Sequence, residues 1–187
     1  MAVAAPAAHG HATHDPLKFN RLGLWMFFFS ESVLFGLLLS ARFFLEGIHK
    51  EHVDQILGLG ITIILLLSSL TAFTAETAIE HNNQRVAHWF LLATIVLGII
   101  FAAGVGFEWK TAEFTRGEAF GSVFFTMTGI HASHVVSGIG LLFLVWIQTK
   151  RGRFNSKSHW AVSGVVMYWH FVDVVWVFFY PALYLVK

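Results

Sequence analysis

Five long apolar stretches constrain the fold of this chain more than any other feature of its sequence. They occupy residues 22–44, 56–75, 86–107, 119–147 and 161–186. A helix needs roughly 20 apolar residues to cross the ~30 Å hydrocarbon core of a bilayer, and each stretch reaches that length. The sequence therefore predicts an all-α integral membrane protein, a bundle of five transmembrane helices. The expected helices span about 19–45, 55–78, 85–107, 118–148 and 158–186.

Composition excludes several classes of protein. Hydrophobic residues make up 56% of the chain and charged residues only 12%, unlike an average soluble domain. The net charge of +1 and the lack of a basic stripe predict no nucleic-acid partner. The absence of cysteine excludes disulfides, thiolate metal sites and thiol catalysis. Residues 1–17 lack the basic and apolar regions of a cleaved signal, so we expect a disordered N-terminal tail.

The distribution of lysine and arginine indicates an orientation in the membrane. Five spans place the N-terminal tail and the loops after the second and fourth helices on one side. That side holds seven basic residues, namely Lys18, Arg21, Arg85, Lys150, Arg151, Arg153 and Lys157. The other side holds five, namely Arg42, Lys50, Lys110, Arg116 and Lys187. Because basic loops favour the cytoplasm, the N terminus is expected to be cytoplasmic and the C terminus outside.

Five ionisable residues lie near the middle of three expected spans. They are Glu31, His131, His134, His170 and Asp173. An aspartate at a helix centre costs ~2.5–3.5 kcal/mol on insertion scales. Pairing with histidine, or protonation, removes most of that cost. His170 and Asp173 are three residues apart, as are His131 and His134, so each pair shares one helix face, which we expect to turn away from lipid.

Three interpretations of this polar layer remain open at the level of residues. It could be a hydrogen-bonded clamp that fixes helix packing or docks a partner subunit. It could be part of a proton route, because acids and histidines in spans often are. It could also bind metal or haem, since facing histidines in a helical bundle can do so. A bis-histidyl haem would need ligands from two helices, for example His134 and His170.

Hydroxyl and aromatic side chains in the spans have simpler interpretations. Ser68 and Ser69 of the second helix can hydrogen-bond to carbonyl groups of their own helix. Tryptophans and tyrosines toward helix ends, such as Trp109 and Tyr184, fit interface anchors. Trp169 and Trp176 lie deeper, where packing against helices is expected.

Three motifs resemble one known family. The run YWHFVDVVW at 168–176 closely resembles the terminal-helix signature of subunit III of the haem–copper oxidases. TGIHASHVVSG at 128–138 resembles that family's T-G-x-H-x-x-H-V stretch. FSESVLF at 29–35 resembles its first shared helix, where a Ser-Glu pair carries a carboxyl that reacts with carbodiimide. Residues 107–109 and 121–125 match the stretch before the His-x-x-His helix.

The resemblance implies a non-redox subunit of a proton-pumping terminal oxidase, which reduces oxygen to water. The family's subunit III carries no haem or copper, which belong to partner subunits. It packs against catalytic subunit I, in a complex with subunit II, binds phospholipid and helps to sustain proton uptake. Its shorter five-helix members occur in bacteria, so the resemblance also implies a bacterial plasma membrane. The electron donor, cytochrome c or quinol, stays open.

For this chain, the resemblance makes the five midplane residues candidates for proton uptake or buried polar contacts. The candidates for lipid or subunit contacts are Glu108, Trp109, Lys150, Arg151, Arg153, His159, Trp169 and Trp176. Two departures matter. The two additional helices of longer members are absent, and Gln148 stands where some members carry an arginine. The alternatives are an accessory protein of nitric oxide reductase, from the same family, and a haem-binding membrane cytochrome.

Overall fold

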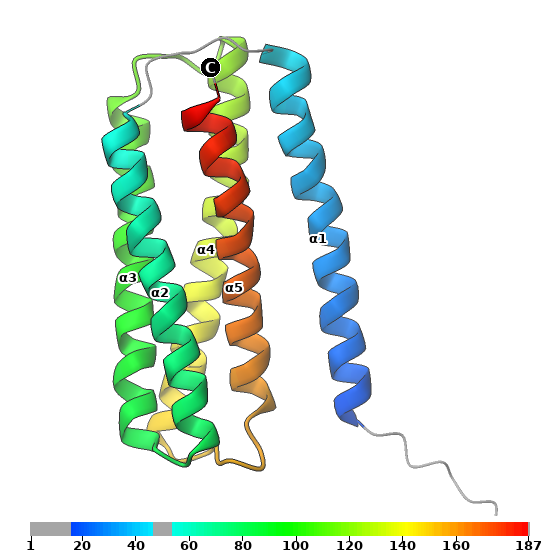
Figure 1. Ribbon diagram of the computed structural model, residues 1–187, viewed down its shortest axis with the longest axis vertical. Helices are drawn as coiled ribbons and strands as arrows, with labels where there is room; N and C mark the ends of the chain where they lie inside the picture. Colours follow the sequence, from blue (N-terminus) through cyan, green and yellow to red (C-terminus); the bar gives the residue numbers. More distant parts are fainter. Residues whose placement is uncertain (1–15, 47–53, 187) are drawn as a thin grey trace, which may run out of the picture.

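The computed structural model describes residues 16–46 and 54–186, and all the regular structure in these two ranges is helical. The elements are α1 (Pro16–Glu46), α2 (Gln55–Glu80), α3 (Gln84–Thr111), α4 (Ala119–Lys150), α5 (Trp160–Tyr180) and a π-helical turn, η1 (Pro181–Leu185). Five helices are long and apolar enough to cross a membrane. They run alongside one another down the long axis of the molecule (Figure 1). The predicted fold class, an all-α membrane protein with five transmembrane helices, is confirmed.

The helix ends differ from the expected ranges at two informative places. The first helix already begins at Pro16, so the last two residues of the expected tail are helical, whereas residues 1–15 lie outside the described ranges. The expected fifth helix divides at Pro181, which has no N–H group to continue the α-helical hydrogen bonding. Beyond it, Val186 N donates to the carbonyl oxygen of Pro181 at 2.9 Å, closing a wider π-type turn.

α5 is the central helix and α1 the peripheral one. The most apolar window of α5 is 56% buried, against 11% for α1. Figure 1 shows α2, α3, α4 and α5 grouped together, with α1 along one side of the group. α1 makes its main contacts with α4 and α5. Side chains that join α1 to the other helices must therefore come chiefly from those two.

Polar residues fix the ends of α2 and α3. The Asp54 carboxylate caps α2 by accepting hydrogen bonds from the backbone N–H groups of Ile56 and Leu57. Asn82, with a φ of 57°, makes the turn between α2 and α3. Its side chain also pairs with Ser156 in the loop between α4 and α5, through hydrogen bonds of 3.1 and 2.9 Å. These contacts join the two loops at one end of the bundle.

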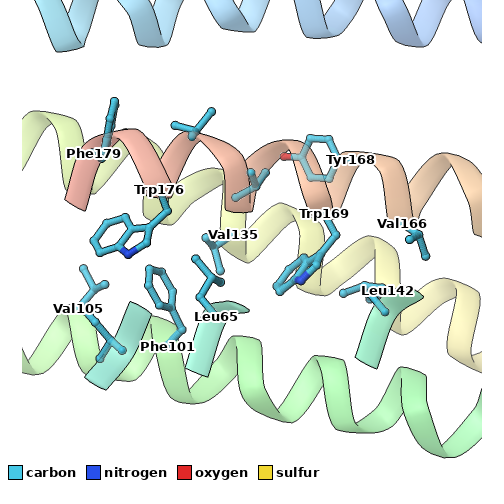
Figure 2. Close-up of a cluster of buried hydrophobic side chains, with 14 of the residues drawn as sticks. Leu65, Phe101, Val105, Val135, Leu142, Val166, Tyr168, Trp169, Trp176 and Phe179 are labelled. Carbon is cyan, nitrogen blue, oxygen red and sulfur yellow. The ribbon is translucent and has the colours of Figure 1, made fainter. Parts of the chain in front are cut away.

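Two tryptophans of α5 fill the centre of the bundle. Trp169 and Trp176 are completely buried, and Figure 2 shows both indole rings pointing from α5 toward α3. Each indole N–H donates to a hydroxyl group of α2, Trp169 to Ser68 at 3.0 Å and Trp176 to Thr62 at 2.9 Å. A buried indole needs such a partner, so these bonds fix α5 against α2.

Candidate functional site

Glu31 and His134 form an ion pair between α1 and α4. Glu31 Oε2 lies 3.2 Å from His134 Nε2, and both side chains are 18% exposed. The other ring nitrogen, Nδ1, lies 2.8 Å from the Ile130 carbonyl oxygen, which can only accept a hydrogen bond. Nδ1 therefore carries a hydrogen, and one further proton between Nε2 and the carboxyl group completes the pair. The contact joins the peripheral helix α1 to the bundle.

Aromatic contacts support this pair on the bundle side. The ring of Phe28 stacks on that of Phe171 of α5, with centroids 4.9 Å apart. The ring of Phe35 meets the imidazole of His134 edge to face at 5.0 Å. These contacts place the acid on the inner side of α1, as its insertion cost requires.

His131 occupies a different environment, although it lies one turn from His134. Its side chain is completely buried, and neither ring nitrogen has a hydrogen-bond partner among the described residues. The rings of Trp176, Phe101 and Phe179 surround it, with centroids at 4.9, 5.8 and 6.1 Å. An imidazole in such an aromatic cage is favoured in its neutral form, because a charge would lose its hydration. It acts here as a packing residue.

His170 and Asp173 do not meet the other two midplane histidines. His170 Nδ1 lies 2.6 Å from the hydroxyl oxygen of Ser69 on α2. Asp173, one turn further along α5, is buried, with 3% of its surface exposed, and neither of its carboxyl oxygens has a hydrogen-bond partner among the residues that the structure describes. The imidazole is therefore bonded to α2, whereas the acid is enclosed by helix packing.

The five midplane residues thus lie in separate environments and not in one continuous layer. Glu31 pairs with His134, His131 lies in its aromatic cage, His170 bonds to Ser69, and Asp173 is buried without a hydrogen-bond partner among the described residues. Each expected acid is turned away from lipid, but only Glu31 finds a histidine partner in the described ranges.

The existing contacts of His134 compete with haem or metal binding. Both ring nitrogens of His134 make contacts of 2.8 and 3.2 Å, which an iron ion would have to displace. In the part of the chain that the structure describes, no group of three or more metal-binding side chains comes together. For His134 and His170, the geometry favours polar contacts between helices, with Glu31 and Ser69 respectively.

Comparison with known proteins assigns the chain to a family. The sequence profile described as Cytochrome c oxidase subunit III matches residues 46–187. This chain belongs to the cytochrome c oxidase subunit III family. The match covers all of α2 to α5, including the His-x-x-His helix and the terminal signature, so the resemblance read from the motifs is confirmed.

Individual relatives extend the match to the whole chain. The chain is 32% identical to Cytochrome c oxidase subunit 3 of Thermostichus vulcanus over 192 residues, which cover 98% of this chain and 93% of the relative. It is 32% identical to the Synechocystis sp. protein of the same name, over 95% of this chain and 79% of the relative. It is 39% identical to that of Spodoptera frugiperda over 66% of this chain and 84% of the relative. Membership in the family makes it a multi-pass membrane protein that partners other oxidase subunits.

The expected lipid or interface residues divide into a buried and an exposed group. Trp169 and Trp176 are fully buried and Glu108 is 4% exposed, so these three lie within the subunit III bundle. Helix packing within this chain encloses them, and their expected contact with lipid or a partner subunit stays a prediction. Trp109 is half-buried and donates to Thr128 at 3.0 Å. The exposed candidates at the loop end are Lys150, Arg151 and Arg153, with the half-buried His159 3.8 Å from Glu80.

Sequence reasoning missed the hydroxyl partners of the buried side chains. Ser68 donates a hydrogen bond to a carbonyl group of its own helix, as expected, but its hydroxyl oxygen also accepts a hydrogen bond from the indole N–H of Trp169. Ser69 bonds to His170 instead. The spacing of these residues is the signal that could have indicated the pairing. Trp169 and Trp176 are seven residues apart on α5, and their partners Ser68 and Thr62 are six residues apart on α2. Tyr184, expected as an interface anchor, is buried and donates to Glu108 Oε2 at 2.6 Å.

Replacing Tyr184 by phenylalanine is expected to destabilise the end of the bundle near η1. Tyr184 provides the hydrogen bond to Glu108 Oε2, and Oε1 already lacks a partner in the described residues. Leaving a buried carboxyl without a partner costs about 1–3 kcal/mol. Thermal unfolding in detergent, followed by circular dichroism, measures the loss. Tyr180→Phe, at a neighbouring ring that stacks on Tyr184, is the matched control. Equal midpoints for the two variants would contradict this role.

Proposed function

We propose that this subunit supports the catalytic subunit of a proton-pumping terminal oxidase without carrying electrons itself. It packs against subunit I, in a complex that also holds subunit II, while haem and copper reside in those partners. The Glu31–His134 pair carries the proposal. An acid paired with an imidazole inside the membrane, on a chain where His134 and His170 make polar contacts with protein groups, fits support of proton uptake better than redox chemistry.

The surface of α1 supports docking of lipid or partner helices. Large apolar side chains there are strongly exposed, with Trp25 66%, Phe29 74% and Leu37 66% exposed. A membrane protein buries such side chains against acyl chains or against another subunit. The peripheral position of α1 leaves this face open in the isolated chain.

Phospholipid binding is proposed at the groove where α1 meets α4 and α5. An open cavity of about 850 Å³ lies there, bordered by apolar rings and small residues. Its lining includes Phe19, Phe27, Leu141, Gly164 and Tyr168. An acyl chain of a phospholipid can pack against this apolar lining. The exposed Lys150 ends α4, the exposed Arg151 and Arg153 follow it, and the cationic groups of all three suit a lipid phosphate.

The proposed location is the inner membrane of a bacterium, with the N terminus in the cytoplasm. The basic loop between α4 and α5 supports this orientation, because it carries Lys150, Arg151, Arg153 and Lys157 on the side of the α2–α3 turn.

Isolation of an affinity-tagged chain tests the proposed function. From mildly solubilised membranes, the tag is expected to recover larger subunits together with haem absorbance and oxygen-reducing activity. Stripped of its partners by a harsher detergent, the chain itself is expected to have no Soret band. A Soret band retained by the isolated chain, or recovery of the chain without any haem-containing partner, would overturn the proposal.

A further inference from the structure

A polar cavity of about 710 Å³ opens between α1, α2 and the start of α5. The start of α1, the end of α2 and the start of α5 lie at the same end of the molecule (Figure 1). The volume falls within the range of about 300–1,000 Å³ that is typical of small-molecule sites. Two cations and two acids line the cavity, namely Arg21, Lys157, Glu76 and Glu80. It therefore differs from the groove between α1, α4 and α5, where the described lining residues include no charged side chain.

The opposite charges in this cavity do not neutralise one another. Among the described residues, no ion pair joins Arg21 or Lys157 to Glu76 or Glu80. Glu80 instead has His159 beside it, with 3.8 Å between Oε1 and Nε2. Charged groups in a partly enclosed space need partners. A ligand that satisfies both signs must itself carry a negative and a positive group.

Adjacent residues at the start of α5 each contact one group of the cavity. The guanidinium group of Arg21 lies over the ring of Trp160, 5.6 Å from its centroid, which holds this cation against the wall. His159, the preceding residue, lies next to Glu80. A cation from α1 and an acid from α2 therefore border the same space on two different helices.

The apolar part of the lining lies deeper in the bundle. Leu24 and Trp25 follow about one turn after Arg21 on α1, and Met167 follows about two turns after Trp160 on α5. The Trp25 side chain is 66% exposed, and tryptophan is enriched at the level of the lipid headgroups. Charged groups above an apolar wall suit a phospholipid, because its acyl chains cover a surface that a soluble zwitterion would leave bare.

We propose that this cavity binds the headgroup of a phospholipid with a primary ammonium group, as in phosphatidylethanolamine. The phosphate accepts hydrogen bonds from Arg21 and Lys157, and the ammonium group donates hydrogen bonds to the carboxylates of Glu76 and Glu80. A choline headgroup has no N–H group to donate, and a glycerol headgroup has no cation. Both would leave the two acids without a partner. The proposal requires that the chain spans a membrane, and it does not depend on the role proposed for the Glu31–His134 pair.

Carbodiimide coupling in the assembled oxidase tests this site directly. A water-soluble carbodiimide activates a carboxyl group, and the amine of a lipid in contact with it displaces the activating group to form an amide. The complex is reconstituted in vesicles of phosphatidylethanolamine and phosphatidylglycerol, and mass spectrometry of its peptides locates the lipid adduct. Adduct on Glu76 and Glu80 is expected to exceed that on Glu113 about tenfold, the effect of one hydrogen bond to a charged group. Glu113 is an exposed acid in the loop between α3 and α4.

Arg21→Gln removes a phosphate partner and leaves both acids in place. It is expected to lower the adduct on Glu76 and Glu80 about tenfold, again the effect of one hydrogen bond to a charged group. Lys18→Gln is the matched control, because it removes an exposed cation of α1 that does not line the cavity, and the adduct is expected to stay unchanged. Arg21→Lys keeps the charge and is expected to restore most of the adduct.

Two results would overturn the proposal. One is an adduct on Glu76 and Glu80 of the wild-type complex no greater than that on Glu113, which needs no variant. The other is an equal loss of adduct in Arg21→Gln and Lys18→Gln, or no loss in either.

Glycerophosphoethanolamine, which has the same headgroup without acyl chains, distinguishes a lipid from a soluble ligand. Added to the complex in phosphatidylcholine vesicles, it is expected to form little adduct on Glu76 and Glu80. Coupling as strong as that of phosphatidylethanolamine would show that the apolar wall contributes nothing, and would contradict a lipid site.

Discussion

Replacing Gly98 by alanine is expected to lower the stability of the subunit by about 1–3 kcal/mol, the usual cost of overpacking a filled core. A Cβ atom at Gly98 of α3 would lie 2.6 Å from Cη2 of Trp169. Two groups restrict the movement of that ring. At Gly138 of α4 there is so little space beside it that an added Cβ would lie 2.9 Å from Cε3 of Trp169, and Ser68 accepts a hydrogen bond from its N–H group. Alanine at position 98 would therefore separate α3 from α5.

Gly106 of the same helix is the matched control. A Cβ atom there meets nothing within 4 Å. Alanine favours a helix over glycine by about 1 kcal/mol, so Gly106→Ala is expected to leave stability unchanged or raise it. Thermal unfolding of the purified subunit in detergent measures both variants. A higher midpoint for Gly98→Ala than for Gly106→Ala would contradict the packing of Trp169.

Removing His134 is expected to be more damaging than removing His134 and Glu31 together. In His134→Leu, the Glu31 carboxyl loses its partner inside the membrane, whereas Glu31→Leu with His134→Leu leaves no polar group to satisfy. A double-mutant cycle should give a coupling free energy of roughly 0.5–3 kcal/mol. The unfolding midpoint of the four proteins measures it.

Ser30→Leu provides the control for this cycle. Ser30 is exposed beside Glu31 on α1, and its hydroxyl group bonds to the Phe27 carbonyl of its own helix. Combined with His134→Leu, it is expected to be additive. If the effects of Glu31→Leu and His134→Leu on stability were also additive, the Glu31–His134 pair would contribute nothing to the attachment of α1.

The sequence predicts the helices well because their length and polarity are local properties. Five apolar stretches of spanning length leave few other folds. It also predicts that Glu31 and Asp173 turn inward, since an acid facing lipid costs several kcal/mol. It does not predict the partner of each acid, because that depends on how far every helix is rotated about its axis. His170 meets Ser69 for this reason, and neither ring nitrogen of His131 meets a hydrogen-bond partner among the described residues.

The sequence also does not predict that α1 lies at the periphery of the bundle. The mean hydropathy of α1, 1.8, lies within the range of 1.6 to 2.5 of the other four spans, and nothing in its sequence shows that α5 would be the central helix. That outcome depends on the two large indoles of α5 fitting against glycines of α3 and α4, a contact between residues distant in the chain. Likewise, the burial of Tyr184 depends on the turn that Pro181 starts, and the sequence alone suggested an anchor at the membrane surface.

Oxygen consumption during sustained turnover tests most directly whether this subunit supports catalysis without carrying electrons. The complex depleted of the chain is expected to start at nearly the rate of the intact complex, with an unchanged haem spectrum, and then to lose activity faster. Adding the purified chain back should restore the longer lifetime. Immediate loss of electron transfer on depletion, or equal lifetimes with and without the chain, would contradict the account.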